Sequence, residues 1–395
     1  MAPLAYSADA HTAAKDVLAL PSIQLFLRRS GLSEERAKIL GKDFIAKLRE
    51  LSMLLEGIPL CIVLAAARYR RNPDTDAILT DVLRTLYIQD PTLEPKAKAV
   101  RASIQWSEQL LSPTARALFH RLSVFYGGWD NRALLDVCVG LAGDNSQILD
   151  AQMELEAYFL VISAHGGRHR MNSVIREFAF ERLKSGGQSD DVLRAHAKYY
   201  AKLGGQNGPK VLERDMKRAV ALLTTESENF NRAFDWCRTN DVKLGLRLAA
   251  GLWPFWVAIG FFSYGRSTVQ EFLSNSDDEA PTLVCRALAG LATLAYFQSD
   301  YRNALELAKR CLLQARKIND TWAQVTVLVI ASIAEVYQPS RDHKRPGPRT
   351  RSLRYLDKSV QLADRQLSAY WLQALAHSNR AFIRAQIDPR KGRSE

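Results

Sequence analysis

The sequence predicts a mainly α-helical protein with three parts in succession: a helical N-terminal region, a small unit with one β-hairpin, and a long α-solenoid. Three observations support this prediction. Apolar residues recur at steps of three and four through most of the chain, which is the spacing of one helix face. A single β-rich run, residues 158–162, precedes a glycine pair. Beyond residue 280, similar segments recur about 40 residues apart, as in repeat proteins.

Length and composition are those of an ordinary globular protein. The chain has 395 residues, of which 47% are apolar and 24% charged, so we expect two or three domains and no long disorder. Its five cysteines include no closely spaced pair and are predicted to be buried thiols in a reducing compartment. No secretion signal is visible. The apolar run 248–262 contains Pro254 and is shorter than the roughly 20 residues of a membrane span, so we expect a cytoplasmic protein without membrane contact.

The net charge of +12 favours acidic partners without identifying one. The only dense basic run begins at Arg341 and extends to Arg354. Pro346 and Pro348 lie within this run and Pro339 just precedes it, so we interpret it as a solvated loop rather than a binding arm.

Within the first 90 residues, helices are predicted at 22–29, 33–55 and 59–71. Residues 1–30 are assigned to an irregular entry segment that ends with the first of these helices. Residues 57–59, Gly-Ile-Pro, interrupt the apolar pattern, and Pro59 occupies a position that the first turn of a helix tolerates. Residues 31–90 are therefore predicted to be one helical domain.

Residues 91–187 are predicted to form a winged-helix domain. Short helices are expected at 97–110, 113–124, 130–140 and 147–158, then a hairpin that turns at Gly166 and Gly167, then a last helix at 174–184. A glycine pair between β-rich runs is a hairpin signal. We expect Trp106 to lie in the core of this domain.

The remaining chain is predicted to consist of helix pairs, with linker repeats over 188–280 and tetratricopeptide-like (TPR-like) repeats over 281–395. Residues 294–298 (LAYFQ), 333–338 (IAEVYQ) and 381–386 (AFIRAQ) are the recurring segments. Such repeats bury their apolar faces only by stacking. The last repeat is expected to be truncated, which would leave an apolar strip including Leu375 and Phe382 open to self-association.

In combination, four ordered segments resemble the bacterial STAND-class predicted ATPases, relatives of the NB-ARC switch proteins and of NB-ARC-like transcriptional regulators. Residues 55–60 (LEGIPL), followed by AAAR at 65–68, look like the GxPL helix of the family's lid. Residues 101–107 (RASIQWS) with LSP at 111–113 are similar to the start of its winged helix. The other two segments are 122–129 (LSVFYGGW) and 170–177 (RMNSVIRE).

The resemblance implies a nucleotide-lid role for Gly57, Pro59 and Leu60, although a plain helix-breaking turn would explain the same residues. It places Asn172 where the NB-ARC relatives carry the histidine of Met-His-Asp, which reports on the nucleotide phosphates. Here the sequence departs from the family, because asparagine is neutral and cannot offer an imidazolium to a phosphate. In complete relatives the bound nucleotide is ATP or ADP.

No G-x-x-x-x-G-K-[ST] motif and no paired-acid strand for magnesium occur in the sequence, so we expect no ATPase activity, no catalytic residue and no cofactor in this chain. His165 and His169 bracket the hairpin turn, but two imidazoles without a third ligand predict a solvated turn and no metal. The expected chain is thus the lid, winged-helix and sensor part of a switch whose P-loop domain is absent from these residues.

Two functions remain open from the sequence. The first is signal transduction or transcriptional regulation, with protein or ligand sensing by the TPR-like repeats. The second is a nucleotide-independent TPR scaffold for a protein or peptide. DNA binding is not expected, because the candidate recognition segment 147–158 carries Asp150, Glu154 and Glu156 but no lysine or arginine.

Overall fold

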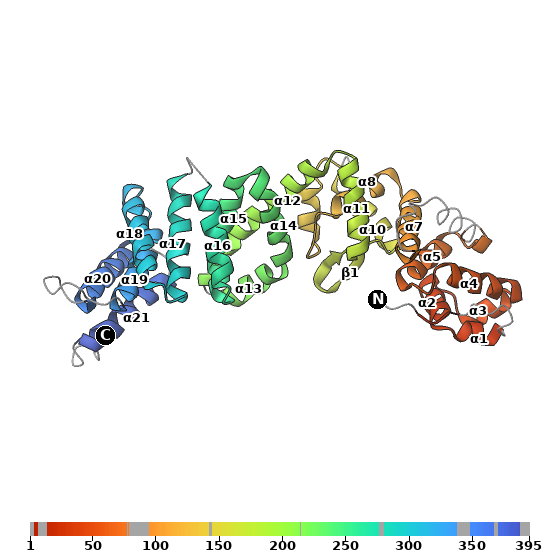
Figure 1. Cartoon of the computed structure of the whole chain (residues 1–395), viewed down its shortest axis with the longest axis horizontal. Coiled ribbons are helices and arrows are strands. Elements are labelled where there is room, and N and C mark those ends of the chain that lie inside the picture. Colours follow the sequence, from red (N-terminus) through yellow and green to blue (C-terminus); the bar gives the residue numbers. More distant parts are fainter. Residues whose placement is uncertain are drawn as a thin grey trace. The chain divides into compact units, whose positions relative to one another are not determined.

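A computed structural model describes residues 4–6, 14–76, 78, 95–141, 144–213, 215–275, 280–337, 348–366 and 370–387. These residues are almost all helical, with one two-stranded antiparallel sheet (Figure 1). The mainly α fold is thereby confirmed. The chain divides into two compact units, Met1–Ala195 and His196–Glu395. The linker expected at Pro91 and residues 341–347 of the basic run lie outside the described residues.

The first unit begins with five helices. They are α1 (Ala14–Ala19), α2 (Pro21–Ser30), α3 (Glu34–Ile39), α4 (Lys42–Leu54) and α5 (Pro59–Arg71). The single helix expected over 33–55 is therefore wrong, since the chain breaks at Gly41, whose φ is +94°. The helix expected at 22–29 is confirmed as α2, whereas residues 14–19, which were expected to be irregular, form the additional helix α1.

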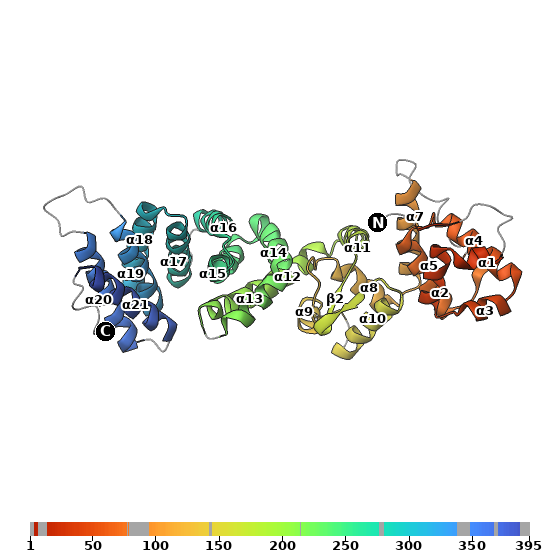
Figure 2. The same ribbon diagram turned by 90° about the horizontal axis from the view of Figure 1, so that it is seen from below.

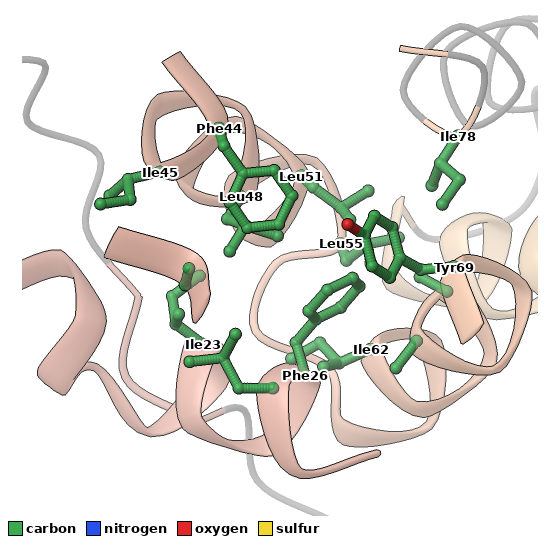
Figure 3. Close-up of a cluster of buried hydrophobic side chains, with 14 of the residues drawn as sticks. Ile23, Phe26, Phe44, Ile45, Leu48, Leu51, Leu55, Ile62, Tyr69 and Ile78 are labelled. Atoms are coloured by element: carbon green, nitrogen blue, oxygen red, sulfur yellow. The ribbon is translucent and has the colours of Figure 1, made fainter. Parts of the chain in front are cut away.

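Helices α1 and α2 belong to the same hydrophobic core as α4 and α5 (Figure 3). Phe26 of α2 and Phe44 of α4 both pack on the ring of Tyr69, with centroids 5.7 and 5.8 Å away. The hydroxyl groups of Ser22 and Ser52 form a buried 2.7 Å hydrogen bond inside this apolar region. Residues 14–30 are thus an integral layer of the lid-like helices.

The second half of this unit contains five helices and the hairpin. They are α7 (Pro95–Gln109), α8 (Pro113–Leu122), α9 (Asn131–Val137), α10 (Asn145–Ala157), β1 (Ile162–Ala164), η1 (His165–Gly167), β2 (Arg168–Arg170) and α11 (Ser173–Ser185). The predicted order of helices and hairpin is confirmed. The first strand begins four residues later than expected, because Phe159 has a φ of +56° and the backbone turns back on α10 there.

Trp129 fixes the hairpin to the helices. Its backbone pairs with that of His169 through two hydrogen bonds of 2.9 and 2.8 Å, beside the register Ser163↔His169 of the two strands. The indole is fully buried, and its N–H donates to the side-chain oxygen of Gln152 on α10, 3.0 Å away. One tryptophan therefore provides an extra backbone bridge to the hairpin and links it to a helix.

Trp106 of α7 does not lie where the sequence suggested. It is 4% exposed, but its neighbours are the apolar residues of the α1–α5 core rather than those of the winged helix. Helix α7 packs against α5 and also against α11. It consequently joins the two halves of this unit.

The second unit begins within helix α12 (Ser189–Asn207), and its described residues are almost all helical. The rest are η2 (Pro209–Leu212), α13 (Met216–Thr225), α14 (Ser227–Asn240), α15 (Val242–Ala258), α16 (Phe262–Ser274), α17 (Pro281–Phe297), α18 (Tyr301–Lys317), α19 (Thr321–Val336), α20 (Pro348–Gln366) and α21 (Tyr370–Ile387). Helix α15 continues through Pro254. The chain turns after the end of α15, at Gly260, whose φ is +77°. No helix in the described ranges is long and apolar enough to span a membrane.

The helices from α15 onward stack as a solenoid (Figure 2). Helices α15, α17, α19 and α21 pack one on the next, while α16, α18 and α20 fill in between successive members. In the last pair, Ile383 is buried with Leu356 and Val360 of α20, whereas Phe382 is 60% exposed. Part of the expected apolar strip is therefore covered by α20; the side chain of Trp371 lies outside the described residues.

Small residues set the distance between α12 and α15. A Cβ atom added to Gly208 would lie 1.7 Å from the carbonyl oxygen of Gly251, so the two backbones are in direct contact. Gly205, three residues earlier, has open space where its Cβ would stand. Only one of these two neighbouring glycines is required by packing.

We expect Gly208→Ala to lower the free energy of unfolding by about 1–3 kcal/mol, the usual cost of forcing atoms into a packed interface. Gly205→Ala is the matched control and should be neutral or stabilise by up to about 1 kcal/mol, since alanine is the better helix former. Urea unfolding followed by circular dichroism measures both. Equal stabilities of the two variants would contradict the close approach of α12 and α15.

Candidate functional site

The turn between α4 and α5 contains the predicted lid residues. Gly57 has a φ of +63°, and its N–H donates to the carbonyl oxygen of Ser52, 3.1 Å away. Glycine adopts this left-handed backbone without the penalty that a side chain brings. Pro59 then begins α5, where its missing N–H costs nothing. The spacing of glycine and proline is therefore explained by the turn itself.

Residues 4–6 lie against this turn. The N–H of Leu4 donates to the carbonyl oxygen of Gly57 over 2.9 Å. A Cβ on Gly57 would stand 2.2 Å from the backbone oxygen of Leu4 and 2.8 Å from the ring of Tyr6. The bare face of Gly57 is thus covered by the chain's own N-terminal residues. Pro59 and Leu60, which follow it, are half-buried.

Three arginines of the first five helices lie over aromatic rings of the winged helix. The guanidinium carbon of Arg68 is 4.2 Å from the ring centroid of Trp106, and that of Arg71 is 4.3 Å from Tyr158. Arg29 lies 5.4 Å from Phe159. Cation–π contacts of this kind contribute about 0.5–2 kcal/mol each. The basic end of α5 therefore helps hold the two halves of the unit together, a role that the AAAR sequence alone did not reveal.

Asn172 caps the helix that follows the hairpin. Its side-chain oxygen accepts a 3.0 Å hydrogen bond from the backbone N–H of Val174, at the N-terminus of α11. Asparagine is among the best residues for this position. The preceding residue, Met171, is buried. Within the described residues, Asn172 bonds to the start of α11 and Gly57 to Ser52 and Leu4, and the two residues do not bond to one another.

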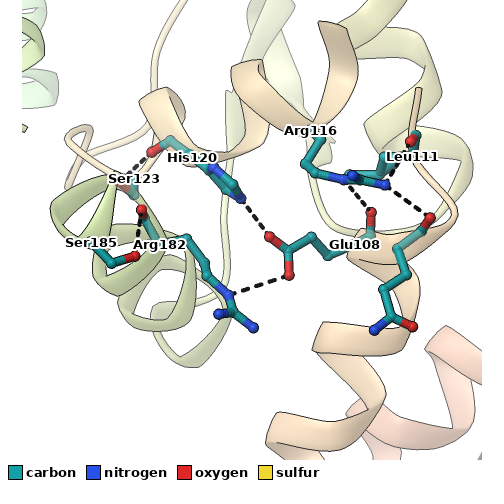
Figure 4. Close-up of polar contacts among 8 residues, drawn as sticks. Glu108, Leu111, Arg116, His120, Ser123, Arg182 and Ser185 are labelled. Carbon is teal, nitrogen blue, oxygen red and sulfur yellow. Dashed lines mark hydrogen bonds and ion pairs between the residues drawn. The ribbon is translucent and has the colours of Figure 1, made fainter. Parts of the chain in front are cut away.

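A half-buried ionic cluster centres on Glu108, near the end of α7 (Figure 4). One carboxylate oxygen is 2.6 Å from Nε2 of His120 on α8, and the other is 3.4 Å from Nε of Arg182 on α11. Arg116 donates to the carbonyl oxygens of Glu108, Gln109 and Leu111, at 3.1, 2.9 and 3.2 Å. These bonds satisfy the C-terminal carbonyls of α7 and fix three helices together.

The acidic residues of α10 are used within the domain. Glu154 accepts hydrogen bonds from the backbone and hydroxyl of Ser112, at 2.9 and 2.7 Å, and so caps α8. Glu156 lies 2.9 Å from Nδ1 of His169 in the hairpin. Glu156 of α10 therefore binds His169. In the described part of the chain, no group of three or more metal-ligating side chains occurs.

The cysteines are buried, as expected, and none forms a disulfide. Burial raises the pKa of the Cys61 thiol to about 11 and those of Cys138 and Cys237 to about 12. A thiol with so high a pKa carries almost no thiolate at neutral pH and is a poor nucleophile. These side chains fill the core.

An aromatic ladder runs along the turns of the repeats. Phe262 stacks on Phe297 with ring centroids 5.2 Å apart, and Tyr301 stacks on Tyr337 at 4.8 Å. Tyr296 joins the two pairs, at 5.1 Å from Phe297 and 6.1 Å from Tyr301. Phe297 and Tyr337 are 45% and 58% exposed. These are the positions that made the 40-residue repeat visible in the sequence.

Polar bonds support the ladder on one side. Arg266 of α16 donates to the side chains of Gln298, at 2.8 Å, and Asp300, at 2.7 Å, in the turn between α17 and α18. The hydrogen bond from Arg266 holds the pKa of the Asp300 carboxyl below its usual value. The turn is thus rigidly placed beside the exposed rings.

Comparisons with known proteins found relatives that are named as regulators. The chain is 31% identical over 338 residues to a protein of Mycobacterium tuberculosis, and to its counterpart in Mycobacterium bovis, each named "Putative HTH-type transcriptional regulator". The match covers 80% of this chain and 37% of the relative, so the chain spans well under half the length of these relatives. No family model matches the chain.

Two further similarities were found. An uncharacterised protein of Mycobacterium tuberculosis is 31% identical over 188 residues, which cover 45% of this chain and 47% of that protein. Among solved structures, a STAND protein with a tetratricopeptide repeat sensor from Pyrococcus horikoshii aligns with a TM-score of 0.47 and 14% identity, over 92% of this chain and 50% of the other.

We expect Gly57→Ala to destabilise the chain more than Gly31→Ala does. Both glycines have a positive φ, +63° and +79°, so both variants pay about 1–2 kcal/mol for a left-handed side chain. Only at Gly57 would the new methyl group meet a backbone atom, whereas Gly31 has open space. Thermal unfolding should show about 1–3 kcal/mol of additional loss; equal losses would mean that Leu4 does not lie on the turn.

Proposed function

We propose that this chain is the lid, winged-helix and sensor part of a STAND-type signalling protein or transcriptional regulator. The observation that carries the proposal is the 31% identity to mycobacterial proteins named as transcriptional regulators, over 338 residues. That similarity extends over 80% of the chain. The aligned stretch is longer than either compact unit, so it includes parts of both. Regulation would therefore involve the helical unit with the hairpin together with the repeats.

In this proposal the first unit is the responsive part and the repeats receive the signal. The cation–π contacts of Arg29, Arg68 and Arg71 support a switch-like role, because they lie between the two halves of the first unit. The aromatic ladder, with two strongly exposed rings, supports a binding role for the repeats. Aromatic side chains are enriched where proteins contact partners.

The winged helix is proposed to act within the protein rather than on DNA. Helix α10, which precedes the hairpin, presents three carboxylates, two of which are already bonded to Ser112 and His169. Carboxylates on this helix would repel the phosphates that a recognition helix must approach. The net charge of +12 is therefore not matched by a basic face on α10.

The proposal includes no nucleotide chemistry in this chain. Because the sequence has no P-loop, we expect no saturable binding of ATP or ADP at micromolar concentration and no ATPase activity above background. Titration calorimetry with Mg-ATP and a phosphate-release assay measure both. A micromolar dissociation constant would contradict this part of the proposal.

A nucleotide-independent scaffold for a protein or peptide is the second candidate. The observation that favours it is the ladder itself, since exposed rings of successive repeats could bind an extended segment without any help from the first unit. Self-association through the exposed Phe382 of α21 is a further proposal for the same unit. The next experiment separates regulation from scaffolding.

The regulatory role is tested by gene deletion and complementation in the organism that encodes the chain. Transcript profiles should change on deletion and be restored by the wild-type sequence and by Leu313→Ala, which alters a 62% exposed side chain of α18 outside the ladder. The double variant Phe297→Ala/Tyr337→Ala should fail to restore them while its melting temperature stays near that of the wild type. An unchanged transcript profile on deletion would reject regulation and leave the scaffold.

A further inference from the structure

Helices α14, α15 and α16 enclose an aromatic pocket of about 290 Å³ in the second unit (green in Figure 1). Protein interiors leave few voids larger than a water molecule, and this volume is close to the lower limit of small-molecule sites, about 300 Å³. The pocket is therefore too large to be a packing defect. It is distinct from the aromatic ladder and from the glycine turn of the first unit.

Aromatic side chains form the floor and one wall of the pocket. Phe230 and Phe234 are 2% and 1% exposed, and the ring of Phe234 lies 6.0 Å from that of Trp256. Tyr264 stands edge-on to Trp256, with centroids 5.7 Å apart and planes at 85°. Ring faces and edges at these spacings provide a flat, polarisable surface that a second ring system can join.

The mouth of the pocket is held by a tight turn. The N–H of Phe261 donates to the carbonyl oxygen of Trp256 at 2.9 Å, across Gly260. Phe261 is 59% exposed, and Tyr264 is 39% exposed, so these two rings mark the solvent side. Gly265 brings α16 against the indole of Trp256, since a Cβ there would lie 2.8 Å from the ring. The wall is thus preformed by the backbone.

The lining selects against charge. Among the described residues, every side chain that lines the pocket is uncharged, and the polar ones include Asn231 and Tyr264. The hydroxyl of Tyr264 donates to the side-chain oxygen of Asn231, 2.8 Å away, and this amide oxygen has a second lone pair that can accept a further hydrogen bond. Beyond the lining, Arg238 is paired with Asp235 and Glu271 at 2.7 and 2.9 Å. A charged ligand would lose its hydration without gaining an opposite charge.

We propose that this pocket binds a free, neutral heteroaromatic compound about the size of indole, with one N–H or O–H group directed to the side-chain oxygen of Asn231. The inference rests on the proposed sensing role of the repeats and specifies the chemistry of the signal. Its two requirements are a ring that packs against the exposed rings of Phe261 and Tyr264 and the absence of a formal charge.

The test is direct binding of 5-fluoroindole to the full chain, followed by fluorine NMR, with unlabelled competitors. We expect saturable binding that indole displaces, while indole-3-acetate and tryptamine compete at least tenfold more weakly. N-acetyltryptophanamide, the neutral stand-in for a tryptophan in a partner peptide, should also compete at least tenfold more weakly. If the amide competes as well as indole or better, the ligand is not a free compound. If the charged analogues compete as well as indole, the pocket does not require a neutral ligand.

Two variants locate the site. Ile259→Trp places a large ring in the pocket and should weaken binding at least tenfold, while Leu313→Trp adds the same side chain on α18 and should leave binding unchanged. Phe261→Ala removes an exposed rim side chain that the fold does not need and should weaken binding several-fold, which keeps the test valid if Ile259→Trp does not fold.

Absence of saturable binding to the folded wild type, or equal binding by Ile259→Trp and the wild type, would refute the pocket assignment. Neither result would bear on gene regulation, because the complementation experiment uses transcript profiles and residues of the ladder. Conversely, indole binding with no transcript change on deletion would retain the pocket and reject the regulatory role.

Discussion

The contact between α5 and α7 is the interaction on which the first unit depends. Helix α7 belongs to the second half of the unit. Its Trp106 is nevertheless buried in the core of the five preceding helices, where Arg68 covers the indole ring. Three residues after Trp106 the same helix ends, and Arg116 binds its final carbonyl oxygens. If α7 were removed, the first core would lose a tryptophan and Glu108 would no longer connect α8 with α11.

Burial of charge is a second constraint on this arrangement. Glu108 is only 7% exposed, and a buried carboxylate is costly unless it is both paired and hydrogen-bonded. His120 and Arg182 provide that compensation from two other helices. A network of this kind adds little stability over an apolar core, but it is satisfied in only one relative placement of its helices. It therefore specifies how α7, α8 and α11 are placed relative to one another.

The second unit follows a different physical rule, because each helix pair can bury its apolar face only against the next pair. Close contacts such as Gly208 on Gly251 set the spacing at the start of this stack. At the α15–α16 turn, large rings surround a space that no side chain fills, which yields the pocket. Further along, the turns carry rings that stack on the following repeat, which yields the ladder. Both proposed binding features thus arise where aromatic residues stand at helix ends.

The sequence by itself determined the mainly helical class, the single hairpin, the order of the short helices around it and the repeat of helix pairs. These features follow from local periodicity and from glycine and proline, whose effects act over a few residues. It also indicated the turn at Gly57 and Pro59. Tertiary structure alone decided which core holds Trp106 and that residues 4–6 cover Gly57. Each of these depends on contacts or local geometry that spacing along the chain does not encode, such as the 2.9 Å bond from Leu4 to Gly57.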